Sequence, residues 1–262
     1  VGEGPPLVKA ANWLSHLEYD WQSPVWQHWL EGLAQHHTLI RYEERGCGLS
    51  DWNVQDFSLE AWVRDLEAVV EATGLERFPL LGISQGGPVA IAYAIRHPER
   101  VSHLILYGTL FRGRLQRELT PQQLEEAQLF LQLMRVGWGQ ENPAFRQVFT
   151  SMFMPEASPE QQRWFNELQR VSTSPENAVR IANTFNTIDA RPLAPQVTTP
   201  TLVLHATGDT EIPLKEGQLT AELIPGARLV PLESKNHILL AQEPAWQQFL
   251  EEVHRFLSVG TG

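Results

Sequence analysis

The sequence predicts an α/β fold: a mainly parallel sheet flanked by helices on both faces. Two observations predict it. Short apolar segments alternate with amphipathic segments of helical length in the first 110 residues and again after residue 196. The length of 262 residues also suits a single domain of this class, with a core large enough to need no disulfide or structural metal.

The elements of the first part follow in order. Strands are expected at residues 7–11, 38–42, 78–83 and 101–107, and helices at residues 25–34, 58–73 and 86–97. The helix at 58–73 has the clearest pattern, because its apolar residues recur at spacings of three and four and Gly74 ends it. Pro98 stops the helix that precedes the fourth strand.

The pattern changes after residue 110. Residues 111–195 are rich in Gln and Glu and predict helices without a strand, with Thr120, Ser158 and Ser174 as N-caps that each precede a proline. Strands return at 201–205 and 228–232, with helices at 214–223 and 244–257. We therefore predict a core of residues 1–110 and 196–262 and a helical cap of residues 111–195 over one end of the sheet.

The composition narrows the classes of partner. The formal net charge is −11 and the isoelectric point about 5.3, without any run of Lys and Arg. This balance argues against nucleic acid and anionic membranes as partners, and no apolar stretch reaches the ~18 residues that span a bilayer. The single cysteine, Cys47, excludes an intrachain disulfide and a thiolate cluster. We expect a cytoplasmic protein without metal or cofactor.

Residues 82–86 carry the pattern G-x-S-x-G, with Ser84 at its centre. An apolar strand precedes it and a helix follows, which is the context that this nucleophile turn requires. The turn is tight enough to favour glycine two residues either side of the serine. A plain glycine-rich turn with Ser84 as a helix cap is the alternative.

A serine nucleophile needs a base, and the base needs an orienting acid. Of the nine histidines, His237 lies in the loop between the last predicted strand and the last helix, where the chain order Ser, Asp, His places the base. Asp209 follows the strand at 201–205 and is the predicted acid, with Glu211 as the alternative. A surface-loop histidine and a turn aspartate are the competing interpretations.

These motifs and the helical segment between them resemble the α/β-hydrolase superfamily over nearly the whole chain. Residues 9–13, 42–52 and 82–87 are similar to bacterial esterase-like α/β-hydrolase domains, some of which are fused to cyclase or helix-turn-helix regulators. Such proteins usually begin with an antiparallel strand pair that this chain lacks. The resemblance then implies six parallel strands with an exposed edge, and either a homodimer or an N-terminal truncation.

The resemblance also implies an oxyanion hole made by two backbone N–H groups. Gln85 follows the nucleophile and supplies one, and Trp13, after the first strand, supplies the other. Many relatives have His-Gly before the second position, whereas this chain has Ala11 and Asn12.

The predicted function is a serine carboxylic ester hydrolase that acts on small to medium apolar esters through an acyl-enzyme. A C–C hydrolase, lactonase, amidase or perhydrolase would use the same triad, and a small-molecule sensor domain is the alternative from another class. The apolar residues of the helical segment either pack its helices or line a substrate pocket. The candidate pocket residues are Phe130, Leu133, Met134, Trp138, Phe149, Met152, Phe153 and Phe185.

Overall fold

The computed structural model describes residues 1–258. Within that range, six strands form one parallel sheet in the order β2-β1-β3-β4-β5-β6. The strands are β1 (Pro6–Lys9), β2 (Thr38–Ile40), β3 (Phe78–Ile83), β4 (Val101–Tyr107), β5 (Thr201–Ala206) and β6 (Arg228–Leu232). The predicted fold class and the six parallel strands are therefore confirmed.

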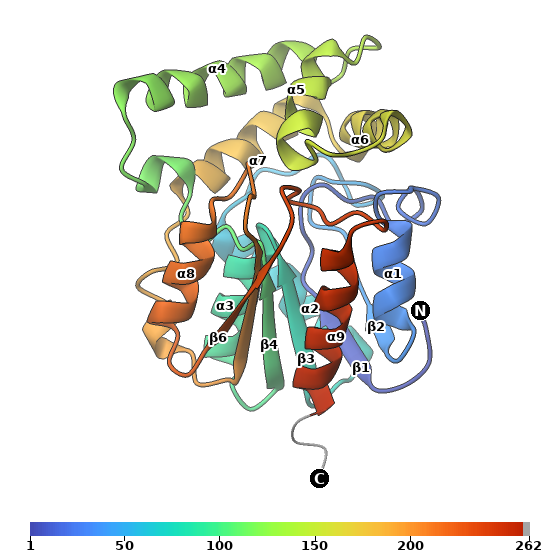
Figure 1. Cartoon of the computed structure of the whole chain (residues 1–262), viewed down its shortest axis with the longest axis vertical. Coiled ribbons are helices and arrows are strands. Elements are labelled where there is room, and N and C mark those ends of the chain that lie inside the picture. Colours follow the sequence, from blue (N-terminus) through green and yellow to red (C-terminus); the bar gives the residue numbers. More distant parts are fainter. Residues whose placement is uncertain (259–262) are drawn as a thin grey trace.

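Helices cover both faces of this sheet (Figure 1). On one face, α1 and α9 pack together through Trp29 and Trp246, whose ring centroids lie 4.7 Å apart. On the other face, α2 packs on α3, which lies against β3 and β4. The bounds are α1 (Gln27–Ala34), α2 (Leu59–Thr73), α3 (Gly86–Arg96), α8 (Leu214–Leu223) and α9 (Pro244–Ser258).

The segment between β4 and β5, residues 108–200, forms a helical insert, which lies across one end of the sheet (Figure 1). Its helices are η1 (Arg114–Gln116), α4 (Pro121–Gly137), α5 (Ala144–Phe153), α6 (Pro159–Ser172) and α7 (Pro175–Thr187), and the short η2 (Ala194–Gln196) leads into β5. Thr120, Ser158 and Ser174 cap α4, α6 and α7 through their side chains, as the sequence predicts.

Local sequence explains why the elements end where they do. In α2, Ser58 accepts a hydrogen bond from the Ala61 N–H, and Gly74 adopts a left-handed φ of +66° at the C-terminal end. The central strand β3 is almost wholly buried because helices cover both of its faces. None of the helices in residues 1–258 combines the length and the apolar character that a bilayer crossing demands.

Candidate active site

Ser84 stands at the sharp turn between β3 and α3. Its backbone has a φ of +51°, a strained conformation for a residue with a side chain, and its N–H donates to the Tyr107 carbonyl at 2.9 Å. A Cβ atom on Gly82 would lie 2.8 Å from the Gly86 carbonyl oxygen, and one on Gly86 would lie 2.9 Å from the Ala11 carbonyl oxygen. The turn therefore excludes side chains on both sides of the serine, as its sequence indicates.

The structure brings the three predicted triad residues together from distant parts of the chain. The Ser84 hydroxyl lies 2.9 Å from His237 Nε2, and His237 Nδ1 lies 2.6 Å from Asp209 Oδ2. All three side chains are buried. The other Asp209 oxygen, Oδ1, accepts hydrogen bonds from the N–H groups of Glu211 and Ile212, which fix the carboxylate in place.

The electrostatics of this trio favour a proton on the imidazole. Burial by itself lowers the pKa of His237, but the charge and hydrogen bond of Asp209, with a further contribution from Glu211, raise it above its ordinary value. Burial by itself raises the pKa of Asp209, but the charge and hydrogen bond of His237 outweigh it and lower the pKa. Asp209 therefore stays ionised, and its charge favours a positive charge on the His237 imidazole.

The loop that carries His237 is held from two sides. The Tyr107 hydroxyl donates to the His237 carbonyl at 2.9 Å, and the His237 N–H donates to the Phe153 carbonyl at 2.8 Å. Gly108 has a φ of +51°, and a Cβ atom there would lie 3.0 Å from His237 Cε1. The sheet and the helical insert together set the position of the imidazole.

The predicted oxyanion donors lie next to each other, although one of them is engaged. Gln85 is the N-cap residue of α3, where backbone N–H groups lack intrahelical acceptors. The Trp13 N–H donates to the Gln85 side-chain oxygen at 2.9 Å. In this structure, therefore, the second predicted donor already has an acceptor.

A buried carboxylate that our sequence analysis missed holds Gln85. The Gln85 side-chain nitrogen donates to Glu44 Oε2 at 2.8 Å, and the thiol of Cys47 donates to Glu44 Oε1 at 3.6 Å. Burial raises the pKa of Glu44 to about 7, although both hydrogen bonds act in the opposite direction. The sequence signal available was a pair of acidic residues, Glu43 and Glu44, that follows the second predicted strand at the same sheet edge as Ser84.

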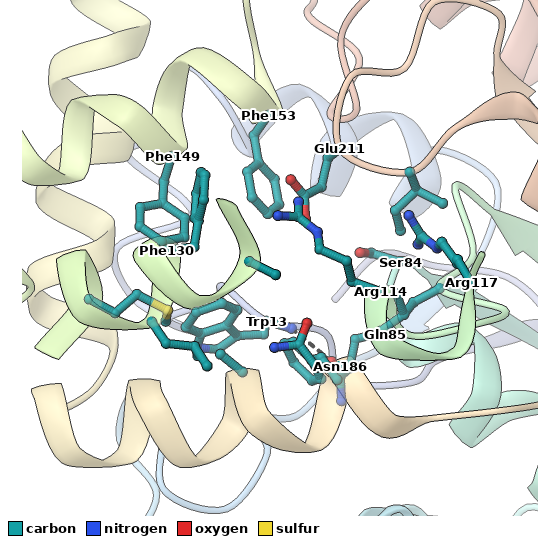
Figure 2. Close-up of a pocket in the computed structure, with 17 residues that line it drawn as sticks. Trp13, Ser84, Gln85, Arg114, Arg117, Phe130, Phe149, Phe153, Asn186 and Glu211 are labelled. Atoms are coloured by element: carbon teal, nitrogen blue, oxygen red, sulfur yellow. Dashed lines mark hydrogen bonds between the residues drawn. The ribbon is translucent and has the colours of Figure 1, made fainter. Parts of the chain in front are cut away.

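A cavity opens over Ser84 between the sheet edge and the helical insert (Figure 2). Its empty volume is about 750 Å³, including the open space at its mouth. Most of its lining is apolar. The polar or charged side chains at its wall are Ser84, Gln85, Arg114, Arg117, Asn186 and Glu211.

The structure brings some of the predicted pocket residues to this cavity and leaves others away from it. Those at the wall are Phe130, Met134, Phe149, Phe153 and Phe185. Leu133, Trp138 and Met152 do not line it. Trp138 instead stacks on Trp13, with 5.2 Å between ring centroids, so it packs behind a residue of the cavity wall.

Comparison with known proteins places this geometry in a family. The sequence profile of the α/β hydrolase fold family matches residues 19–244. The chain belongs to that family. Both the predicted fold class and the family resemblance are thereby confirmed.

Relatives of this α/β hydrolase include hydrolases of several bond types. This chain is 25% identical over 242 residues to a putative carbamate hydrolase, RutD, of Yersinia enterocolitica; the alignment covers 90% of this chain and 84% of that one. The esterase RhEst1 from Rhodococcus sp. ECU1013 superimposes with a TM-score of 0.79 at 26% identity, covering 99% of this chain and 93% of that one. The enol-lactonase from Burkholderia xenovorans LB400 shares the fold, with a TM-score of 0.77 at 24% identity, over 98% and 92% of the two chains.

Proposed function

We propose that this α/β hydrolase is a serine carboxylic ester hydrolase that works through an acyl-enzyme. One observation carries the proposal: Ser84, which lines a largely apolar cavity, is hydrogen-bonded to His237, and His237 is hydrogen-bonded to Asp209. A serine hydroxyl becomes a nucleophile at neutral pH when a base of this kind can take its proton.

The reaction proceeds in two halves. Ser84 Oγ attacks the ester carbonyl while its proton moves to His237 Nε2, and the imidazolium then gives that proton to the leaving alcohol. Water, deprotonated by the same nitrogen, attacks the acyl-enzyme and releases the acid. Asp209 remains ionised throughout and stabilises the imidazolium.

The backbone N–H of Gln85 stabilises the negative charge that develops on the carbonyl oxygen. We retain the Trp13 N–H as the second donor. In the resting structure, that N–H donates to the side-chain oxygen of Gln85. The side-chain amide of Gln85 must therefore turn away when substrate binds. Glu44 provides the hydrogen bond that opposes this movement.

The cavity supports acyl and alcohol groups of small to medium size. Phe130, Phe149 and Phe153 supply apolar surface near the nucleophile, and burying such surface favours binding by about 25 cal/mol per Å². Lactones are cyclic esters and react by the same steps, so they are included among the proposed substrates; the fold shared with an enol-lactonase favours testing them.

Labelling combined with turnover tests this function. The protein is treated with a fluorophosphonate probe, and hydrolysis of p-nitrophenyl butyrate is followed for the wild type, Ser84→Ala and Ser151→Ala. Ser151 is exposed on α5 and serves as the matched control. We expect labelling at Ser84 and loss of turnover by about 10³-fold or more in Ser84→Ala alone, with unchanged circular dichroism.

Two results would overturn the proposal. The first is a label that maps to another residue or persists in Ser84→Ala. The second is tight binding of small molecules with negligible hydrolysis across a panel of esters and lactones, which would favour the sensor function instead.

A further inference from the structure

Arg114 is an unusual side chain for the wall of an apolar cavity. It is the first residue of η1, directly after Gly113 in the segment that follows β4, and is half-buried. Figure 2 shows its side chain extending into the cavity on the same side as Ser84 and Glu211. The centre of its guanidinium lies 5.3 Å from the centroid of the Phe130 ring, which packs against the cation.

The neighbouring arginines are already committed to protein groups. Arg112 makes two hydrogen bonds to the buried Glu216, at 3.1 and 2.8 Å. Arg117 donates to the Arg112 carbonyl at 3.0 Å and lies 3.9 Å from Glu216. These contacts hold the segment that carries Arg114 in a fixed position.

Arg114 itself lacks such partners. Across residues 1–258, its guanidinium has no hydrogen bond to a protein atom and no carboxylate within 4.0 Å; its contact is the Phe130 ring. Glu211 interacts with it electrostatically from a greater distance. A guanidinium presents a planar set of N–H donors that fits a carboxylate, and in Arg114 no protein group occupies these donors across residues 1–258.

The charges at the wall favour an anion. Two of the three charged side chains that line the cavity, Arg114 and Arg117, are cationic, and the third, Glu211, is acidic. Burial raises the pKa of Glu211, while both arginines oppose that rise. Among the side chains that line the cavity, cations therefore outnumber anions, in a protein whose net charge is −11.

We propose that Arg114 binds a carboxylate of the substrate, so that the preferred substrate is an ester or lactone that carries an anionic carboxylate away from the scissile bond. The aromatic wall holds the carbon chain between the two groups, and Ser84 meets the carbonyl. Arg117 adds positive charge at the same end of the cavity. Arg114 is thus a specificity residue, and the inference rests on the proposed function for the position of the reacting carbonyl.

Matched substrates test the proposal. Mono-4-nitrophenyl glutarate is compared with 4-nitrophenyl pentanoate, which places the carboxylate on the acyl side, and 4-acetoxybenzoate with its methyl ester, which places it on the alcohol side. We expect the anionic member of at least one pair to have the higher kcat/KM. Arg114→Met should lower that anionic-to-neutral ratio by about 10- to 100-fold, and Arg114→Lys should lower it less.

Two further variants separate recognition from general charge effects. Arg191→Met removes one positive charge from an exposed pair with Asp189 outside the cavity and should leave the ratio unchanged. Glu211→Gln removes the acidic group from the wall and should raise the ratio. A merely structural role for Arg114 does not predict opposite shifts from the two side chains.

A binding measurement keeps this test independent of turnover. Binding of monophenyl glutarate and of phenyl pentanoate to Ser84→Ala protein is measured by calorimetry, with and without Arg114→Met. Preference for the anion that depends on Arg114 supports the inference even if no ester is hydrolysed, in which case the proposed function alone fails. Equal ratios and equal affinities in the Arg114→Met and parent proteins would overturn the inference while leaving the hydrolase assignment intact.

Discussion

At the scale of single residues, the structure distinguishes between two carboxylates that the sequence offers as the acid. Asp209 bonds directly to the base, with 2.6 Å between Oδ2 and His237 Nδ1. Glu211 instead lines the cavity and acts on His237 through its charge. The two side chains therefore have different tasks although they stand two positions apart.

Substitution should separate these tasks. Asp209→Asn should reduce kcat on p-nitrophenyl butyrate by about 10³- to 10⁴-fold, because the amide no longer selects the required tautomer or stabilises the imidazolium. Glu211→Gln should keep most of that activity. Steady-state kinetics of both variants, with folding checked by circular dichroism, provide the measurement; comparable losses in the two variants would contradict the assignment.

The pH profile adds a second readout for Glu211. His237 must be neutral to act as a base, so activity falls as the pH drops through its raised pKa. Removing the Glu211 charge lowers that pKa, and the acid limb of kcat/KM should move to lower pH in Glu211→Gln. An acid limb that moves to higher pH or stays in place would contradict this effect of Glu211 on the pKa of His237.

At the scale of elements, the helical insert is specified largely by its caps. Ser158 accepts from the Gln161 N–H, and the Gln161 side chain accepts in return from the Ser158 N–H at 2.9 Å. By contrast, the N-cap residue of α5, Pro143, makes no side-chain hydrogen bond, and the preceding Asn142 accepts from the Ala144 N–H at 3.0 Å instead. The sequence predicts helical structure there, but we assigned no cap to the start of this helix.

Removing one cap should therefore have a measurable cost. Ser158→Ala should lower the free energy of unfolding by about 1 kcal/mol, because the first turn of α6 loses an acceptor. Ser158→Asp keeps an acceptor and adds a charge that the helix N-terminus favours, so it should stay close to wild type. Urea unfolding of the three proteins tests this; equal stability of the alanine and aspartate variants would refute the capping role.

At the scale of the whole molecule, the helical insert contacts the sheet domain at the loop that carries His237, the proposed general base. The Glu156 N–H donates to the Asn236 side chain at 3.0 Å, next to the bond from the His237 N–H to the Phe153 carbonyl. The end of α5 thus buttresses the histidine loop while its aromatic residues form part of the cavity wall. The part of the insert that holds the His237 loop therefore adjoins the part that lines the cavity.

Buried charge beneath the site makes stability depend on pH. The pKa of Glu44 is raised to about 7 in the folded protein, above its value of about 4.3 in an unfolded chain. The folded state therefore holds the proton more tightly. The stabilisation linked to that proton is fully present below the unfolded pKa and is lost as the pH rises through 7.

Glu44→Gln should remove this dependence because its amide is never ionised. Relative to wild type, the variant should gain about 2 kcal/mol in free energy of unfolding between pH 5 and pH 8. Glu71→Gln, at an exposed position on α2, is the matched control and should follow wild type. The buried-acid interpretation would be contradicted if the free energies of unfolding of wild type and Glu44→Gln differed by the same amount at pH 5 and at pH 8.

The sequence by itself determined the order and type of the elements, because periodicity, proline, glycine and cap residues act locally. It also determined the nucleophile turn, since a side chain two positions before or after Ser84 would meet a backbone carbonyl oxygen. It identified His237 and Asp209 as candidates because strand ends of a parallel sheet gather at one edge.

Only the tertiary structure decided which side chains face the cavity and which pack behind it. Trp138 and Phe149 are both apolar aromatic residues of the insert. Trp138 stacks on Trp13 and does not line the cavity, whereas Phe149 lines it. The burial of Glu44 and the contact between its carboxylate and Gln85 depend on residues 41 positions apart. Solvation and charge at such a site are set by neighbours in space, and local sequence carries no record of them.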